Sequence, residues 1–277
     1  MSSFEGRTAL VTGASRGLGQ ALTTAALEAG HRVLATVRGE HSLPSHERLL
    51  VHRLDVRDRD GAHAAVARAQ DHFGRLDVLV NNAGYGLVGA VEEVAEEEAR
   101  QIIDTDLLGA LWLTQAALPV MRAQGAGHIV QISTVGAVGT MPTLGLYNAA
   151  KWGLEGFSEA LAAEVSRFGI RVTIAEIGGI DTDWATGSMQ FAAPIPAYDE
   201  LRNELFGSPV VPWPSTGGTG GGTPPQEVAT AILRHVTDPQ DDRLRLVVGD
   251  DAAEQVLAAL RLRHVDYQRD ERFHGAF

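Results

Sequence analysis

The chain has no cysteine, which excludes a disulfide framework and a thiolate metal site. Cysteine usage therefore does not indicate whether the protein works in an oxidising or a reducing compartment. Its N-terminus lacks a basic segment followed by an apolar stretch, so the sequence predicts no secretion signal. The longest apolar run, residues 107–121, is too short to span a membrane and includes Thr114 and Gln115, which favours a buried helix. We therefore expect a cytoplasmic protein without a membrane segment.

Basic residues are scarce, and nearly all of them are arginine. The chain has 23 basic and 35 acidic residues, and a net charge of −12 argues against binding a polyanion such as nucleic acid. Any phosphate that binds must therefore be neutralised locally. Lys151 is the only lysine, and it stands four residues after Tyr147, one of four tyrosines. That position invites a chemical explanation.

Short apolar runs alternate with helical segments along most of the chain. The runs predict strands at 7–12, 32–37, 49–56, 76–84, 127–134, 170–177 and 244–249, and helices lie between them at 17–29, 61–73, 92–115 and 147–168. Apolar strands separated by helices predict an α/β fold, a Rossmann-type doubly wound parallel sheet covered on both faces. We expect a single domain over 1–277, with its ligand beyond the carboxyl ends of the strands.

The alternation breaks over 183–225, which is rich in proline and glycine and too long for an ordinary connection. We interpret this segment as a substrate lid. It carries the large apolar side chains Trp184, Met189, Phe191, Tyr198 and Trp213. Such lids shape the substrate pocket. The apolar side chains of this segment therefore predict an apolar substrate of moderate size.

Three glycines, Gly13, Gly17 and Gly19, follow the first predicted strand and open a helix. Glycine permits a tight turn and a close approach of the backbone, and the helix N-terminus offers free N–H groups to a pyrophosphate. The spacing differs from the general dinucleotide fingerprint, so on its own it is also compatible with a structural turn.

The end of the second predicted strand discriminates between cofactors. An NAD site usually has an acidic residue there for the ribose 2′-hydroxyl, whereas this chain has Val37 followed by Arg38. Arg38, together with Arg16 in the glycine loop, can pair with a 2′-phosphate through charged hydrogen bonds. We therefore expect NADP(H) rather than NAD. The alternative is that both are ordinary surface arginines.

Tyr147 and Lys151, four residues apart, lie on one face of a helix. An ammonium beside a phenol lowers the pKa of the phenol, which makes it a usable proton donor and acceptor. The lysine can also reach a ribose hydroxyl. Taken alone, the pair is equally compatible with a solvated helix face.

Five motifs then occur in a recognisable order. They are TGASRGLG at 12–19, LDV at 54–56, NNAG at 81–84, YNAAK at 147–151 and GGIDT at 178–182. Over nearly its whole length the chain resembles the short-chain dehydrogenase/reductase family. The lid and the segments PQEVATAIL and LRLVVG are similar to the branch that includes steroid and retinol dehydrogenase-like reductases.

The resemblance implies roles for individual residues. The cofactor phosphates would be held by Gly13, Arg16, Leu18 and Gly19, with Ser15 beside them, and the adenine by Asp55 and Val56. The adenosine ribose side would contact Asn82, Ala83 and Gly84, and the nicotinamide amide would contact Ile180 and Thr182, next to Gly178 and Gly179. Tyr147 would transfer the proton to or from the substrate oxygen. Lys151 would bind the nicotinamide ribose and bias Tyr147.

Three positions depart from the family pattern. The family's catalytic serine corresponds to Thr134, thirteen residues before the tyrosine, with Ser133 next to it as the fallback. The family's helix asparagine corresponds to Asp106, which is nearly isosteric but adds a negative charge and loses the amide donors. That charge would keep Lys151 protonated and oppose the phenolate of Tyr147. A usual proline-glycine pair is here Ile177-Gly178.

Other candidate sites have simpler explanations. The acidic run 91–98 is typical of the exposed start of a helix, where carboxylates favour the dipole. The ten histidines show no helical pair or carboxylate cluster, so we predict no metal. Ser133 has no histidine and aspartate that the sequence places beside it, so a hydrolase triad is unsupported.

The sequence thus predicts an NADPH-dependent oxidoreductase that interconverts a ketone or aldehyde and an alcohol on an apolar substrate. The resemblance to the steroid and retinol branch implies a polycyclic or secondary-metabolite compound. The rival is a cofactor-binding protein of the same fold that acts as an isomerase, a cyclase or a nucleotide sensor. The resemblance implies a homodimer or homotetramer formed through residues 107–121 and 153–168. Substrate identity, stereochemistry and direction stay open.

Overall fold

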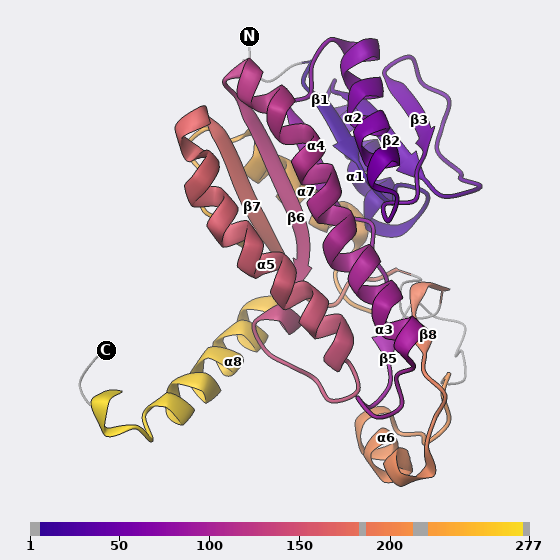
Figure 1. The fold of residues 1–277 in the computed structure, drawn as a ribbon, viewed down its shortest axis with the longest axis vertical. Coiled ribbons are helices and arrows are strands. Elements are labelled where there is room, and N and C mark those ends of the chain that lie inside the picture. Colours follow the sequence, from indigo (N-terminus) through magenta and orange to yellow (C-terminus); the bar gives the residue numbers. More distant parts are fainter. Residues whose placement is uncertain (1–5, 183–186, 213–220, 274–277) are drawn as a thin grey trace.

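The computed structural model describes residues 6–182, 187–212 and 221–273, and a sheet of seven parallel strands forms its centre (Figure 1). The strands are β1 (Thr8–Val11), β2 (Arg32–Val37), β3 (Leu49–Arg53), β4 (Val78–Asn81), β6 (Gly127–Thr134), β7 (Ile170–Ile177) and β9 (Arg245–Val248). Their spatial order is β3-β2-β1-β4-β6-β7-β9. The order therefore reverses between β1 and β4, which is where a doubly wound sheet binds its ligand.

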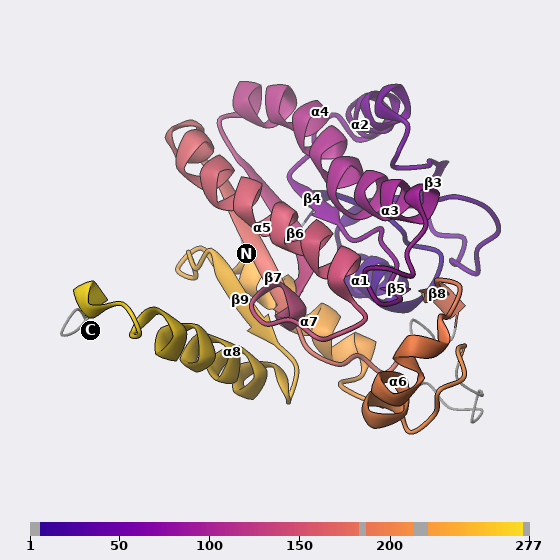
Figure 2. The same ribbon diagram turned by 60° about the horizontal axis from the view of Figure 1, so that its bottom comes forward.

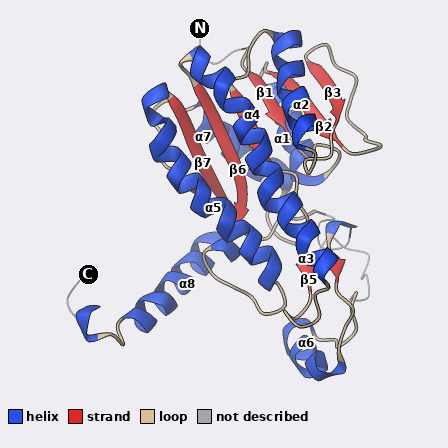
Figure 3. Ribbon diagram, in the orientation of Figure 1, coloured by secondary structure: helices blue, strands red, loops and turns tan. Residues whose placement is uncertain are grey.

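Helices cover both faces of the sheet, as Figure 3 shows. One face packs against α1 (Gly17–Glu28) and α7 (Pro225–Thr237), and the other packs against α2 (Arg59–Phe73), α4 (Gly109–Gln124) and α5 (Gly145–Val165). Each face has its own apolar core, because strands buried on both sides carry apolar residues throughout. The Rossmann-type fold predicted from the sequence is confirmed.

The described part of the lid lies at the carboxyl edge of the sheet (Figure 2). It contains β8 (Gln190–Phe191), which pairs with β5 (Leu87–Val88), and the helix α6 (Asp199–Phe206). Trp184 and Trp213 lie outside the described residues. Tyr198 donates its hydroxyl to Glu92 Oε2 at 2.7 Å, so its polar end faces an exposed carboxylate.

The structure corrects several predicted bounds. The helix predicted over 92–115 begins only at Glu96 and runs without a break to Gln124, as α3 (Glu96–Ile103), a π-helical turn (Asp104–Leu108) and α4. Strands β3 and β4 are shorter than expected. The sequence analysis did not predict α7 or the C-terminal helix α8 (Ala252–Tyr267).

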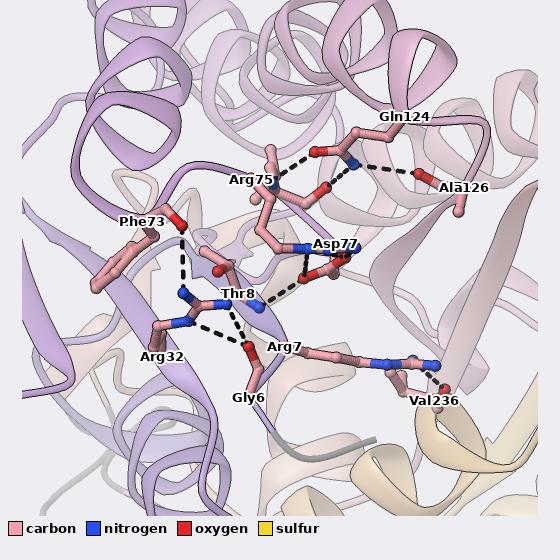
Figure 4. A network of polar contacts seen from close by, with 11 residues as sticks. Gly6, Arg7, Thr8, Arg32, Phe73, Arg75, Asp77, Gln124, Ala126 and Val236 are labelled. Carbon is pink, nitrogen blue, oxygen red and sulfur yellow. Dashed lines mark hydrogen bonds and ion pairs between the residues drawn. The ribbon is translucent and has the colours of Figure 1, made fainter. Parts of the chain in front are cut away.

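A polar network ties the amino ends of the strands together (Figure 4). Asp77 accepts the backbone N–H of Thr8 at 2.8 Å and the guanidinium of Arg75. Arg32 donates to the carbonyls of Gly6 and Phe73. These bonds satisfy backbone groups where the strands begin, at the edge opposite the segment 187–212.

A buried chain of hydrogen bonds links β6, β7 and α7. Arg171 can only donate, so His128 Nδ1 accepts its bond of 3.1 Å, which leaves Nε2 of His128 to donate to Thr173 at 2.8 Å. Thr173 in turn bonds His235 Nε2 at 2.7 Å, and His235 Nδ1 lies 2.8 Å from Asp241. The series Thr173, His235 and Asp241 has the order of a catalytic triad. Because Thr173 is only 1% exposed, we assign the series a structural role.

The stability of the fold should fall in acid because His128 must stay neutral. Burial, with Arg171 next, holds the pKa of His128 well below its usual value, so unfolding takes up a proton below about pH 6.5. Each such proton removes up to about 1.4 kcal/mol of unfolding free energy per pH unit. Denaturant titrations between pH 8 and 5 should show this slope reduced by one proton in His128→Asn. The exposed-site control His63→Asn should keep the wild-type slope, and an equal slope in His128→Asn would contradict the assignment.

Candidate active site

Tyr147 and Lys151 lie on the buried face of α5, where the sequence analysis placed them. The ammonium of Lys151 donates to the carbonyl of Ile132 at 3.1 Å and lies 5.9 Å from the ring centre of Tyr147. The hydroxyl of Thr134, the last residue of β6, is hydrogen-bonded to Tyr147. The structure thus brings together the three side chains that were predicted to act on a substrate oxygen.

Asp106 lies behind this group, in the π-helical turn between α3 and α4. Its Oδ2 is 3.3 Å from Lys151 Nζ, and both side chains are buried. Its Oδ1 accepts the backbone N–H of Tyr85 at 3.1 Å. A Cβ added at Gly84 would lie 2.7 Å from Asp106 Oδ2, so only glycine leaves room for the carboxylate there. Single π turns are frequent at functional sites, and this one directs Asp106 towards Lys151.

Burial raises the pKa of two groups in the site, Asp106 and Tyr147. Burial raises the pKa of Asp106 to about 6, although the ammonium of Lys151 opposes that rise. Burial and then the charge of Asp106 raise the pKa of Tyr147, while the hydrogen bond from Thr134 lowers it. The lowering of the Tyr147 pKa that its spacing from Lys151 predicts is therefore not found, because burial, and after it the charge of Asp106, raises that pKa. The opposition from Asp106 that we expected is found.

Ser133, the fallback for the catalytic hydroxyl, points elsewhere. Neighbouring strand residues face opposite ways, and Ser133 donates to Glu155 Oε1 at 2.5 Å. Glu155 also binds Arg245, which contacts Glu176 on β7. This buried cluster joins α5 to three strands, so Ser133 belongs to the packing that positions α5. Thr134 remains the candidate.

The glycine loop has the geometry of a phosphate cradle. Gly13 and Gly17 have φ angles of +65° and +55°, which side chains rarely adopt. A Cβ on Gly19 would lie 2.3 Å from the carbonyl oxygen of Gly13. The first turn of α1 follows directly, with its free N–H groups and positive dipole end. The residues present therefore fit a dinucleotide pyrophosphate, with Ser15 and Leu18 in the same turn.

Thr12 fastens this loop to the NNAG segment, a role that the sequence analysis missed. Its hydroxyl accepts the N–H groups of Asn82 and Ala83, both at 2.9 Å. Asn82 donates back to the carbonyls of Thr12 and Gly13, at 2.8 and 3.2 Å. The ends of β1 and β4 are thus held together on either side of the point where the strand order reverses.

Basic residues gather where β2 and β3 end. Hydrogen bonds from Arg57 lower the pKa of Asp55, and the charge of the exposed Arg38 adds a smaller lowering. Arg53 donates to the Arg38 carbonyl at 3.0 Å and lines a surface hollow of about 640 Å³ with Gly39, Glu40 and His41. Sequence reasoning missed Arg53, which only strand pairing brings beside Arg38.

Arg16 takes a different partner from the one expected. Its guanidinium donates to the carbonyl of Gly187 at 2.9 Å, which joins the glycine loop to the described end of the lid. Arg16 can approach a phosphate only by giving up or sharing this contact. Val56, the adenine candidate, is buried, and a Cβ on Gly109 would lie 2.7 Å from it.

The segment predicted to meet the nicotinamide follows β7. The carboxylate of Asp251 accepts the N–H of Gly179 at 3.2 Å, and a Cβ on Gly178 would lie 2.1 Å from it. Thr182 is buried and lies within 4 Å of the Cβ position of Gly17, so this segment and the phosphate loop adjoin. Ile180 makes a bridge with Thr223. Asp251 carries no signal in a single sequence, because its partner is a backbone N–H group.

A buried ion pair fixes the lid and corrects the interpretation of the acidic run 91–98. Glu93 and Arg202 have side chains only 2% exposed and bond each other. Arg202 also donates to the carbonyls of Ile195 and Pro209, and Glu93 accepts the N–H of Ile195 at 2.7 Å. Glu93 is therefore not part of a solvated helix face. The described part of the lid is docked on the segment after β5.

Within 6–182, 187–212 and 221–273 no group of three or more histidine, aspartate or glutamate side chains is arranged to hold a metal ion. No helix in the same ranges is long and apolar enough to cross a membrane. The polar side chains that the structure brings together at the site are Tyr147, Lys151, Thr134 and Asp106. The glycine cradle lies at the same edge of the sheet.

Comparison with known proteins agrees with this geometry. Residues 7–192 match the family model for short chain dehydrogenase. The oxidoreductase BOA17 of Botryotinia fuckeliana is 38% identical over 257 residues, which cover 88% of this chain and 89% of that protein. A 3-ketodihydrosphingosine reductase of Bacteroides thetaiotaomicron is 39% identical over 173 residues, covering 62% of this chain and 64% of that protein.

A solved structure extends the match over nearly the whole chain. The crystal structure of a short-chain dehydrogenase from Streptomyces avermitilis has a TM-score of 0.83 and 34% identity, and it covers 96% of this chain and 98% of its own. The matched region contains the glycine cradle and the buried Tyr147–Lys151 pair, so fold, site and similarity agree. The chain belongs to the short-chain dehydrogenase/reductase family, whose members are oxidoreductases that use a nicotinamide cofactor.

Proposed function

We propose that this protein is an NADPH-dependent oxidoreductase that interconverts a ketone or aldehyde and an alcohol. The observation that carries the proposal is the buried hydroxyl of Tyr147, hydrogen-bonded to Thr134 and backed by Lys151. Two hydroxyls at one point can both bond a carbonyl oxygen, and one of them can give it a proton. We expect a cytoplasmic homodimer or homotetramer.

Each side chain has one task in the reaction. Thr134 holds the substrate oxygen against Tyr147, and Tyr147 donates its proton to that oxygen during reduction or takes it back during oxidation. Lys151 holds the cofactor ribose and supplies a positive charge close to the phenol. The bound nicotinamide supplies or accepts the hydride at the substrate carbon.

The electrostatics favour reduction at neutral pH. Burial and then Asp106 raise the pKa of Tyr147, so its hydroxyl is protonated throughout the neutral range, as donation to a carbonyl requires, and it is a weaker acid than an ordinary tyrosine. The oxidative direction needs the phenolate and is favoured only as the pH rises. We therefore assign reduction, in which Tyr147 donates its proton, as the direction that the site favours at neutral pH.

The surroundings of Tyr147 support an apolar substrate. The ring packs in a cluster with Tyr85, Leu87 and Ile102, and Leu144 and Leu146 pack against the cluster. The relative named 3-ketodihydrosphingosine reductase bears the name of a ketone reductase. A ketone on an extended apolar skeleton is therefore a better first candidate than a sugar, and polycyclic or secondary-metabolite ketones belong in the same test.

Oxidation of NADPH in the presence of a panel of apolar ketones and aldehydes tests the proposal. Turnover should fall by about 10²- to 10⁴-fold in Tyr147→Phe, because general acid catalysis contributes that much. Thr134→Val should also lose most activity, whereas Ser133→Ala should stay within about tenfold, because that hydroxyl serves packing. The non-redox rival would be favoured if the protein bound NADPH but no carbonyl compound oxidised it, and if Tyr147→Phe behaved like the wild type in this assay.

Asp106→Asn should preserve or raise turnover at neutral pH. Above about pH 6 Asp106 is a carboxylate that raises the pKa of Tyr147, so removing its charge lowers that pKa. The pH profile of alcohol oxidation should then move to lower pH by at least about one unit. Asp104→Asn, in the same π-helical turn, is the control and should leave the profile in place. A large loss of turnover at every pH would instead give Asp106 a specific chemical role.

Arg38→Leu should raise the KM for NADPH by about 10- to 100-fold and leave the KM for NADH nearly unchanged, because a charged hydrogen bond to phosphate contributes about 1.5–3 kcal/mol. Arg68→Leu, an exposed change on α2, is the control. Initial rates with both cofactors give the comparison. A wild-type KM lower for NADH than for NADPH would overturn the assignment to NADP.

A further inference from the structure

The connection between β6 and α5 joins the two hydroxyls of the site. It begins directly after Thr134 and leads into the first turn of α5, which carries Tyr147. Two polar side chains that have no role in the proton transfer, Thr143 and Asn148, lie where this connection meets α5. The backbone N–H of Asn148 donates to the carbonyl of Leu144 at 2.9 Å, so both side chains belong to the same end of the helix. We call Thr143 and Asn148 the polar pair.

Thr143 has a strained backbone. Its φ angle is +68°, and every other residue with a positive φ in the ranges 6–182, 187–212 and 221–273 is a glycine. A β-branched side chain crowds the backbone in this conformation, and glycine would relieve the crowding. The carbonyl of Thr143 accepts the N–H of Gly89 at 2.8 Å, a bond that a glycine would make equally well. The turn alone therefore does not explain a threonine here, and strain of this kind clusters at functional sites.

Both members of the polar pair are buried without a hydrogen-bond partner in the described part of the chain. Thr143 is 6% exposed and Asn148 is 3% exposed. The hydroxyl of Thr143 and both the amide oxygen and the amide nitrogen of Asn148 have no partner among the described residues. Such unpaired groups destabilise a fold, so each of them requires an explanation. A ligand that pairs with them would supply one.

The amide of Asn148 lies close to the hydroxyl of Thr134. A Cβ built on Gly136 would be 2.8 Å from the amide oxygen of Asn148 and 3.6 Å from the hydroxyl oxygen of Thr134. Both oxygens therefore lie within 4 Å of one point beside Gly136. Two polar groups placed so close together can bind two neighbouring atoms of one ligand.

Thr143 lies where the site meets the lid. Its neighbour Leu144 packs against the apolar cluster that contains Tyr147. Gly89, which donates to Thr143, is in contact with the lid, because its Cβ position is 2.6 Å from the Cβ of Ala192. Thr143 is thus placed on the side of Tyr147 from which we expect the substrate.

We propose that Thr143 and Asn148 form a polar subsite for a second oxygen atom of the substrate, and that the preferred substrate is an α-hydroxy ketone or an α-diketone on an apolar skeleton. The proposal rests on the proposed function, in which Thr134 and Tyr147 bind the reacting carbonyl oxygen. A hydroxyl on the neighbouring carbon can donate to the amide oxygen of Asn148 and accept from its nitrogen, and a keto oxygen there can accept from either member of the pair. The second oxygen is bound and not transformed.

The second group of the substrate should be uncharged. Lys151 supplies the ammonium of the site, and its Nζ is already 3.3 Å from Asp106 Oδ2. Because the polar pair carries no charge, a carboxylate or a phosphate held there would have to compete with Asp106 for Lys151. Hydroxyl and keto groups cost less to remove from water, and hydrogen bonds to the polar pair offset that cost.

Reduction of deoxybenzoin and benzoin by NADPH tests the proposal, because the two ketones share one skeleton and differ only in the α-hydroxyl. The wild type should favour benzoin in kcat/KM by about 10- to 100-fold, as a site built to bind a hydroxyl does. Thr143→Val and Asn148→Ala should each lower this preference by about tenfold, whereas Thr143→Ser retains the hydroxyl and should keep it. Comparing variants cancels the intrinsic difference in reactivity between the ketones.

Thr8→Val is the matched control. It also removes a buried hydroxyl that has no partner among the described residues, but Thr8 begins β1, at the opposite edge of the sheet. The preference for benzoin should be the same in this variant as in the wild type. The comparison is repeated with the best ketone of the panel and its α-hydroxy derivative.

Thermal melting separates a substrate subsite from a packing role. Thr143→Gly removes the strain and the unpaired hydroxyl together, so it should raise the melting temperature while it lowers the preference for the hydroxy ketone. A lower melting temperature with an unchanged preference would assign Thr143 to packing and overturn the proposal.

The subsite and the proposed function fail in different ways. If ketones are reduced but the preference is the same in the wild type, Thr143→Val and Asn148→Ala, the subsite is overturned and the proposed function stands. If no carbonyl compound of the panel is reduced, the proposed function is overturned and the subsite with it.

Discussion

The parallel direction of the sheet is the constraint on which the site depends. Seven strands that run the same way present their carboxyl ends at one edge, so residues far apart in the chain meet there. Thr134 ends β6, Asn82 follows β4, and the glycine loop follows β1. The opposite edge is closed by backbone-satisfying contacts such as those of Asp77 and Arg32. The side chains that we assign to the reaction therefore lie at the carboxyl end of the sheet.

Sequence reasoning predicted this edge well, because its signals are local. Local spacing determines the geometry of the glycines at the strand-to-helix turn. It also places the tyrosine and the lysine on one helix face, whatever the rest of the chain does. Thr134 and Asp106 were identified only through the resemblance to a known family, as the positions of its catalytic serine and its helix asparagine. The resemblance to a known family then supplied the roles that spacing alone leaves open.

The residues that were missed have partners far along the chain. Glu93 looks like one more carboxylate in an acidic run until the fold brings Arg202 to it, 109 residues later. Arg53 lies beside Arg38 only through the pairing of β2 with β3. Ser133 and Thr134 are alike as hydroxyls, and only the alternation of a strand, with Glu155 behind it, separates their roles. A single sequence gives no direct signal of which distant residues contact each other in the fold.

The charge balance of the site explains why Asp106 matters beyond its hydrogen bond. With Tyr147 protonated, one carboxylate and one ammonium face each other in a buried space, and the two neutralise each other. When Tyr147 gives up its proton, two negative charges share the single ammonium of Lys151. Burying an unbalanced charge is expensive, so the phenolate here must be short-lived or matched by a further positive charge. An asparagine would leave one negative and one positive charge at that stage. This chain thus favours the protonated state of Tyr147, because the charge of Asp106 adds to the effect of burial.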